Sequence, residues 1–181
     1  RFSLEDIQEV RLCVDEAVLA KSARLRGRRV IVLDCWSLGR DYRSPGKYAA
    51  ENYDSRSIDW DGVRSAVRYY KDKDVIPIAL LSRRLLRDDK SIPADLQREI
   101  FIPPGKARHG VMFTDVLCAE LSLYRFAMEL NCQYVTNWSM ASDSDCFVSQ
   151  GDVREWAYSS EGARLKVEFI WDTLGSYIPL K

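Results

Sequence analysis

The stretch Val30-Ile31-Val32-Leu33-Asp34 decides the fold class of this chain of 181 residues. Four apolar residues follow one another without a polar interruption, and three of them are β-branched. Such a run predicts a strand that is buried on both faces, as the strands of parallel sheets are. The sequence therefore predicts an α/β protein with a central parallel sheet.

Apolar periodicity along the rest of the chain predicts an alternation of helices and strands. Helices are expected over residues 4–24, 60–71, 94–99 and 117–128, with one or two closing helices over 153–158 and 165–171. Further strands are expected over residues 75–81, 100–102, 111–113 and 133–136. Parallel strands need long crossover connections, so this order predicts helices on both faces of the sheet. The hydrophobic content of 46% is ample for the core of a single domain.

A polar stretch from Ser37 to Ser57 follows the first predicted strand. It has no periodicity and is longer than the loops that compact domains usually contain, so we expect a functional or a mobile loop. Trp36 and Tyr42 alternate here with Arg40 and Arg43, a mixture typical of surfaces that bind single-stranded RNA. A partly ordered loop explains the same residues equally well.

The charge balance gives no overall sign to the molecule, because 27 basic residues face 27 acidic ones. Residues 1–109 nevertheless carry five more basic than acidic side chains, and residues 110–181 carry five fewer. This asymmetry predicts one basic and one acidic face. No apolar run approaches the ~18 residues of a membrane-spanning helix, and no signal peptide is recognised.

The five cysteines, at positions 13, 35, 118, 132 and 146, form an odd set without a CxxC pair or a metal-ligand spacing. Reduced thiols, most of them small buried side chains, are the expected state. The sequence therefore predicts a reducing compartment, either the cytoplasm or the nucleus.

Three of the predicted strands end in polar residues, and ligands of open parallel sheets bind beyond the carboxyl ends of the strands. These residues are Asp34, Thr114-Asp115 and Thr136-Asn137, with Asp143 and Asp145 shortly downstream. Carboxylates that meet at one edge repel one another unless a hard cation such as Mg²⁺ or Mn²⁺ bridges them. Such an ion lowers the pKa of a bound water and holds a phosphodiester.

Each acidic residue also has a structural interpretation. Asp115 directly precedes a long predicted helix and is placed to be its N-cap, although capping and metal ligation can coexist. Asp34 at a strand end can be a loop or capping residue, and Asp143 and Asp145 lie in a Ser/Asp-rich turn where carboxylates are usually solvated. His109 is the only histidine and has no Ser or Cys partner in the sequence, so a catalytic triad is not expected.

The order of the motifs resembles that of a known family. Residues 30–38, VIVLDCWSL, are similar to a strand that ends in an Asp-Gly-x-Asn-Val box, and residues 62–70, GVRSAVRYY, to a helix with an Ala-Val-x-Tyr/Phe centre. Residues 113–117, FTDVL, are similar to the start of an Asp-Asp helix, and residues 135–138, VTNW, to a Val-Ser-Asn-Asp strand end. On these motifs residues 28–181 resemble the Regnase-like (CCCH-zinc-finger-associated) NYN ribonuclease domain of the PIN-like nucleases. The helix within residues 1–27 lies outside the resemblance.

The resemblance implies a three-layer α/β sandwich that binds a divalent ion through four acidic side chains and cuts single-stranded RNA with an activated water. Carried over by position, Asp34 and Asp115 match two of the metal ligands. The sequence departs from the family at the other positions: Thr114, Trp138 and Ser142 stand where acids are expected, Asp143 lies beside the last of these, and Ser37 replaces an Asn.

These departures leave two hypotheses. The first is a catalytically weakened or inactive relative that binds RNA or pairs with an active NYN nuclease in RNA silencing or decay, as a homodimer or heterodimer. The second is an endoribonuclease that uses Mg²⁺ or Mn²⁺, with Asp143 or Asp145 in place of a lost acid. The first is favoured, because losing one element of transition-state stabilisation typically costs about a hundredfold in rate or more. The residues expected to contact RNA are Ser37, Arg83, Arg84, Lys106, Arg108 and Asn137.

The helix within residues 1–27 carries apolar residues close to helical spacing. An unpartnered amphipathic helix gains little from propensity alone. We therefore expect this helix to pack on the domain itself or on a partner subunit.

Overall fold

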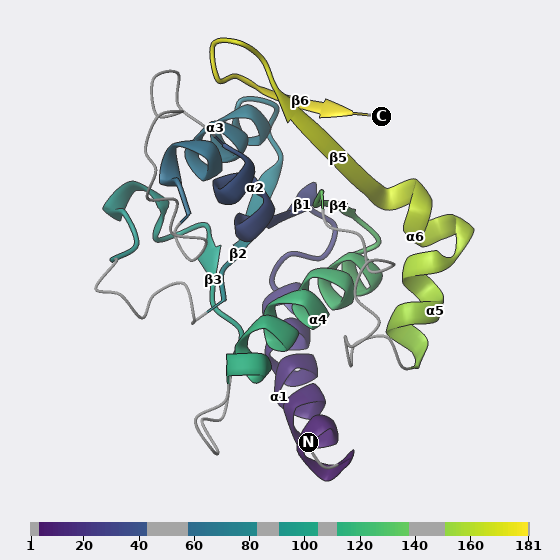
Figure 1. Cartoon of the computed structure of the whole chain (residues 1–181). Helices are drawn as coiled ribbons and strands as arrows, with labels where there is room; N and C mark the ends of the chain where they lie inside the picture. Colours follow the sequence, from purple (N-terminus) through teal and green to yellow (C-terminus); the bar gives the residue numbers. More distant parts are fainter. Residues whose placement is uncertain (1–3, 43–57, 83–90, 105–111, 138–150, 181) are drawn as a thin grey trace.

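A computed structural model of the chain describes residues 4–42, 58–82, 91–104, 112–137 and 151–180, with residues 4, 6, 7, 10, 41 and 112–118 described by their backbone alone. Six strands form one sheet in the order β3-β2-β1-β4-β5-β6 (Figure 1). The first five are parallel and β6 pairs antiparallel with β5. The strands are β1 Val30–Asp34, β2 Ile76–Leu80, β3 Ile100–Phe101, β4 Gln133–Val135, β5 Lys166–Trp171 and β6 Tyr177–Leu180.

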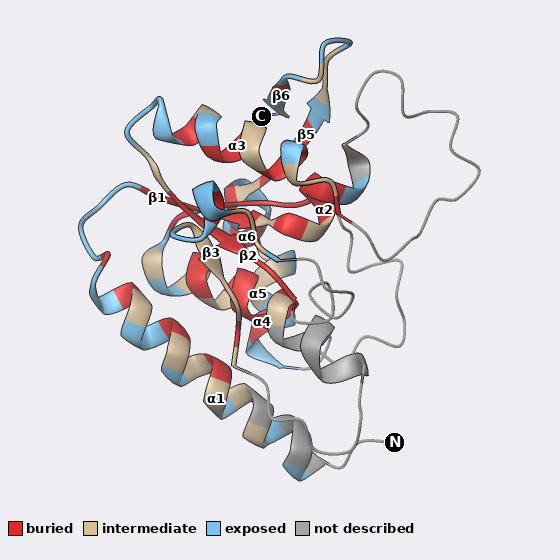
Figure 2. Cartoon of the chain, turned by 90° about the vertical axis from the view of Figure 1, so that its left-hand side faces the viewer, coloured by how far each residue is buried: buried red, intermediate tan, exposed pale blue. Residues whose placement is uncertain are grey.

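Helices cover both faces of the sheet, as the sequence predicted. Residues Ile31 and Leu33 of β1 pack into a cluster with α2 and α3, whereas Val30 and Val32 pack into a second cluster with α1, α4, α5 and α6. In Figure 2 the buried strands lie between α3 on one side and α4 with α1 on the other. The three-layer α/β sandwich is therefore confirmed. The helices are α1 Leu4–Ala23, α2 Cys35–Asp41, α3 Trp60–Lys71, α4 Met112–Leu130, α5 Asp152–Tyr158 and α6 Ser160–Leu165, with a 3-10 turn at Ala94–Leu96.

The N-terminal helix α1 packs against α4 and does not stand alone. Val14 and Val18 of α1 are fully buried in the same cluster as Phe126 of α4. At the edge of this contact the Arg125 Nε donates to Asp15 Oδ1 at 2.7 Å. The amphipathic helix has thus found its partner surface within this chain.

Three sequence predictions are wrong. Residues 37–41 form most of α2 and are not a loop, because Asp34 caps a helix that begins directly after β1. Residues 112 and 113 are the first residues of α4 and not part of a strand, so Asp115 is the fourth residue of this helix and not its N-cap. The apolar run before Thr114 is too short for its pattern to distinguish a helix from a strand.

The third error concerns the end of the chain, where residues 166–171 form β5 instead of a closing helix. Val167 and Phe169 are buried while Glu168 and Ile170 are exposed, which is the alternation of a strand. The antiparallel strand β6 was not predicted at all. It follows a turn in which Gly175 adopts a φ of +82°, a conformation that favours glycine.

None of the helices in the described part of the chain combines the length and the apolar character needed to cross a bilayer. Among the cysteines described, Cys13, Cys35 and Cys132 carry free thiols, and the last two are buried.

Candidate functional site at the carboxyl ends of the strands

Asp34 joins β1 to α2 without an intervening residue, and its carboxylate is fixed by the helix that it starts. The Asp34 Oδ1 accepts the backbone N–H of Trp36 at 3.0 Å, which is the hydrogen bond of an N-cap. The Ser37 hydroxyl, one turn into the helix, donates to Asp34 Oδ2 at 2.7 Å. Asp34 is therefore a capping residue, one of the two interpretations open from the sequence.

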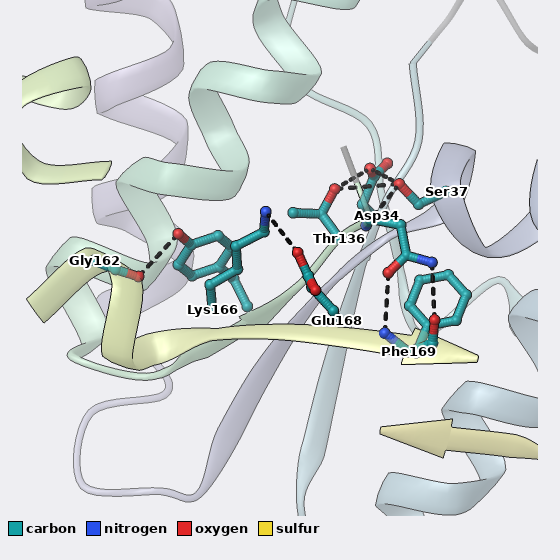
Figure 3. A network of polar contacts seen from close by, with 9 residues as sticks. Asp34, Ser37, Thr136, Gly162, Lys166, Glu168 and Phe169 are labelled. Carbon is teal, nitrogen blue, oxygen red and sulfur yellow. Dashed lines mark hydrogen bonds and ion pairs between the residues drawn. The ribbon is translucent and has the colours of Figure 1, made fainter. Parts of the chain in front are cut away.

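Thr136 brings the end of β4 to the same carboxylate. Its hydroxyl donates to Asp34 Oδ2 at 2.8 Å, and the Thr136 and Ser37 oxygens lie 3.2 Å apart (Figure 3). Neighbouring parallel strands end at the same edge, so the expected meeting of Asp34 with the residues after β4 is observed. We call Asp34, Ser37, Thr136 and the Trp36 N–H the Asp34 network.

The Asp34 network is internally consistent for a charged carboxylate. Both hydroxyls donate to Oδ2, which leaves the Ser37 oxygen free to accept the backbone N–H of Asn137 at 3.3 Å. Ser37 and Thr136 are almost completely buried. Burial raises the pKa of Asp34 above its usual value, and the hydrogen bonds from Ser37, Thr136 and Trp36 oppose only part of that rise. The pKa of the neighbouring Cys35 thiol is raised well above its usual value, first by burial and then by the charge of Asp34.

Asn137, predicted to contact RNA, uses its side-chain amide within the sheet. Its Oδ1 accepts the Phe169 N–H at 3.0 Å and its Nδ2 donates to the Phe169 carbonyl at 2.9 Å (Figure 3). The amide thereby continues the hydrogen bonding between β4 and β5 by one more residue. Both polar atoms of the amide are engaged by the backbone of β5.

The side chains described at this edge do not provide enough oxygen ligands for a Mg²⁺ or Mn²⁺ ion. A carboxylate offers about four acceptor positions, and three of those of Asp34 already receive donors of this chain. Magnesium requires nearly octahedral oxygen coordination. Among the described residues no three His, Cys, Asp or Glu side chains gather into a group that could hold an ion. The side chains of Asp115 and Asp143 lie outside the described part of the chain, and so do those of Thr114 and Trp138.

Glu120 is an acidic residue near this edge that the sequence analysis missed. It lies on α4 one turn before Tyr124 and is only 7% exposed. Burial raises the pKa of Tyr124 far above its usual value, and the charges of Glu120 and Asp34 both add to the rise. Both carboxylates therefore act electrostatically on the same tyrosine. The signal in the sequence was a Glu on the apolar stripe that also contains Tyr124 and Met128.

The aromatic and basic residues beside Asp34 lie in two different environments, the surface of α2 and the packing around β5. The Arg40 guanidinium lies 5.8 Å from the centre of the Trp36 ring on the surface of α2, where Trp36 is half-buried and Arg40 is exposed. Tyr42 packs edge-on against Trp171, with ring centres 4.8 Å apart, so it belongs to the packing around β5. The other residues predicted to contact RNA lie outside the described part of the chain: Arg83, Arg84, Lys106 and Arg108.

We compared the chain with protein-family models, with curated proteins and with solved structures, and none of the three comparisons gives a match. The candidate site is therefore argued from its own geometry.

Proposed function

We propose that this chain is an NYN/PIN-like domain that binds single-stranded RNA and whose catalytic site is weakened or inactive. The order of motifs in residues 28–181 and the parallel α/β sandwich both support this family. The polar edge formed by β1 and β4 is the position at which such a sheet binds ligands. Pairing with an active NYN partner is the other role open to a weakened relative.

One observation carries the proposal of weakened catalysis, namely that three of the about four acceptor positions of Asp34 already receive donors of this chain. Its three hydrogen bonds come from a backbone N–H and two buried hydroxyls, none of which carries a charge. Neutral donors stabilise the carboxylate where a metal site would use a cation and further carboxylates. Ser37 and Thr136 thus give Asp34 a structural function as the cap of α2.

Binding of RNA is supported by Trp36 and Arg40, which lie on α2 at the same edge. Trp36 is half-buried, and base stacking on the accessible part of an aromatic ring contributes about 1–3 kcal/mol per base and tolerates any sequence. A guanidinium stacked on the ring adds a positive charge for the phosphate backbone. A single strand that crosses the carboxyl ends of β1 and β4 would meet both groups.

Fluorescence anisotropy with a labelled single-stranded RNA tests the binding function. We expect Trp36→Leu to weaken binding at every salt concentration, and Arg40→Gln to lower the slope of log K against log salt by about 0.7. Arg164→Gln on α6 is the matched control, because it removes another exposed guanidinium from a different part of the fold. Equal losses in Arg40→Gln and Arg164→Gln would remove α2 from the interface.

A cleavage assay with Mg²⁺ or Mn²⁺ tests the catalytic function of the same chain. We expect slow cleavage or none, and no further loss in Asp34→Asn. Rapid metal-dependent cleavage that disappears in Asp34→Asn would establish the endoribonuclease hypothesis instead. Light scattering on the same sample gives the mass and reports whether the chain forms a dimer.

A further inference from the structure

A second candidate site begins beside the amino end of β2 and extends along the sheet to β3, whose Phe101 is paired with Leu80. A pocket of about 380 Å³ opens there between the C-terminal end of α1 and the starts of β2 and β3. This volume lies within the range of about 300–1,000 Å³ that small-molecule sites occupy. We call it the basic pocket. Figure 2 views the molecule from the side on which α1 and β3 lie.

The floor of the basic pocket is apolar and partly open to solvent. Ile76 and Phe101 line it, are half-buried and pack against the cluster that contains α1 and α4, whereas Ile100 of the same lining packs against the cluster on the other face. The Phe101 ring is held edge-on against Phe126 of α4, with ring centres 5.0 Å apart. Such a floor can accept a flat or apolar body of a ligand.

The rim of the basic pocket is positively charged, with four basic and two acidic residues in the lining. One pair is internal, because Lys71 Nζ lies 2.7 Å from Glu99 Oε1. Asp74 is the remaining acid. Lys21, Arg28 and Arg98 form no ion pair with any residue that the structure describes. Three cations therefore surround an apolar floor with a single carboxylate left to balance them.

The end of α1 does not cancel this positive charge. The C-terminus of a helix carries a partial negative charge on its last carbonyls. Here the Lys21 carbonyl accepts the Arg24 N–H at 3.2 Å and the Ser22 carbonyl accepts the Leu25 N–H at 3.0 Å. Two of the terminal carbonyls are thus already bound, and the side chains determine the local field.

We propose that the basic pocket binds a nucleoside monophosphate group, either as a free nucleotide or as the 5′-terminal nucleotide of an RNA. Arg28 and Arg98 offer forked donors that match a phosphate, and Lys21 adds a point charge. The half-buried surface of Ile76 and Phe101, which share one face of the sheet, accepts the base. The site shares no residue with the Asp34 network or with Trp36 and Arg40, so it can fail or hold independently of the proposed function.

Isothermal titration at low ionic strength tests the ligand class with three probes: inorganic phosphate, adenosine and adenosine 5′-monophosphate. Because both the phosphate and the base contribute, we expect the nucleotide to bind at least tenfold more tightly than either part. Phosphate binding as tightly as the nucleotide would overturn the proposal, since the pocket would then hold only an inorganic anion. Absence of nucleotide binding at millimolar concentration would overturn it as well.

Variants locate the site and distinguish the source of the nucleotide. Lys21→Gln combined with Arg98→Gln should weaken nucleotide binding at least tenfold, whereas the control pair Arg24→Gln and Arg164→Gln, outside the pocket, should leave it unchanged. Equal losses in both pairs would show non-specific attraction and overturn the site. A 5′-phosphorylated trinucleotide that binds more tightly than the mononucleotide assigns the pocket to an RNA terminus. A trinucleotide that binds less tightly than the mononucleotide assigns it to a free nucleotide. For either assignment, the double variant of Lys21→Gln and Arg98→Gln must bind the nucleotide no more tightly than it binds inorganic phosphate.

Discussion

The two ends of the central sheet use charged groups in opposite ways. At the carboxyl ends of the strands one half-buried carboxylate, Asp34, is bound by three neutral donors of the chain itself. Beside the amino end of β2, Lys21, Arg28 and Arg98 surround an open apolar floor without an ion pair among the described residues. A carboxylate whose hydrogen bonds come from the chain itself holds local structure together, whereas charges without an ion pair among the described residues are available to a ligand.

This contrast separates stability from binding along the length of the strands. The sheet is only about five residues long at its centre, so the two ends are less than ~20 Å apart. Changes at the Asp34 network should therefore alter the free energy of unfolding, and changes at the basic pocket should alter ligand affinity with little effect on unfolding.

The largest expected effect is that of Asp34→Ala. This change removes the N-cap of α2 and leaves the buried hydroxyls of Ser37 and Thr136 without their acceptor, which together should cost about 3 kcal/mol. Asp59→Ala is the matched control, because Asp59 caps α3 through its bond to the Asp61 N–H. That loss should be only about 1 kcal/mol. Urea denaturation measures both, and equal losses would show that the hydroxyls add nothing to the cap.

A smaller loss is expected from Thr136→Val, which keeps the shape of the side chain and removes one donor. The carboxylate of Asp34 then keeps only two of its hydrogen bonds in a buried position, at an expected cost of about 1–2 kcal/mol. The pKa of Asp34 should rise further, because the Thr136 hydroxyl lowers it in the unaltered chain. Thr136→Ser restores a hydroxyl and should recover most of the loss in urea denaturation. A valine variant as stable as the unaltered chain would contradict this role of Thr136.

The central part of this arrangement could be read from the sequence, and the parts that failed have physical reasons. The apolar run of β1 is uninterrupted and mostly β-branched, which predicts a buried strand, so the strand and the polar residue at its end were both found. β5 was misread because Ile170 is apolar although it is 50% exposed, which obscures the alternation of Val167 and Phe169 with exposed neighbours. The pairing of Asp34 with Thr136 follows from adjacent strand ends, whereas the burial of Glu120 depends on how α4 is rotated on the sheet.

The pH dependence of stability provides a test of the buried charge. The pKa of Asp34 in the folded state lies above its usual value of 3.8, so the folded protein holds this proton more tightly than the unfolded chain does. The contribution of Asp34 to stability should therefore be most favourable below about pH 4 and should fall as the pH rises through the folded-state pKa. The measurement is the difference in unfolding free energy between the unaltered chain and Asp34→Asn as a function of pH. A difference that increases with pH would mean that the hydrogen bonds outweigh burial.

The smallest expected effect on stability is at the basic pocket. Lys21→Gln combined with Arg98→Gln removes two positive charges that have no ion pair among the described residues, and Arg98 is exposed. Surface changes of this kind usually alter the free energy of unfolding by less than about 0.5 kcal/mol. Without ligand the double variant should be slightly more stable than the unaltered chain, because Lys21, Arg28 and Arg98 repel one another across the pocket. With a saturating nucleotide the unaltered chain should become the more stable one, since a ligand that binds only the folded state raises its stability by mass action. Thermal unfolding with and without adenosine 5′-monophosphate measures which of the two proteins is the more stable in each condition. A double variant that is much less stable without ligand would show that these cations stabilise the fold as Asp34 does.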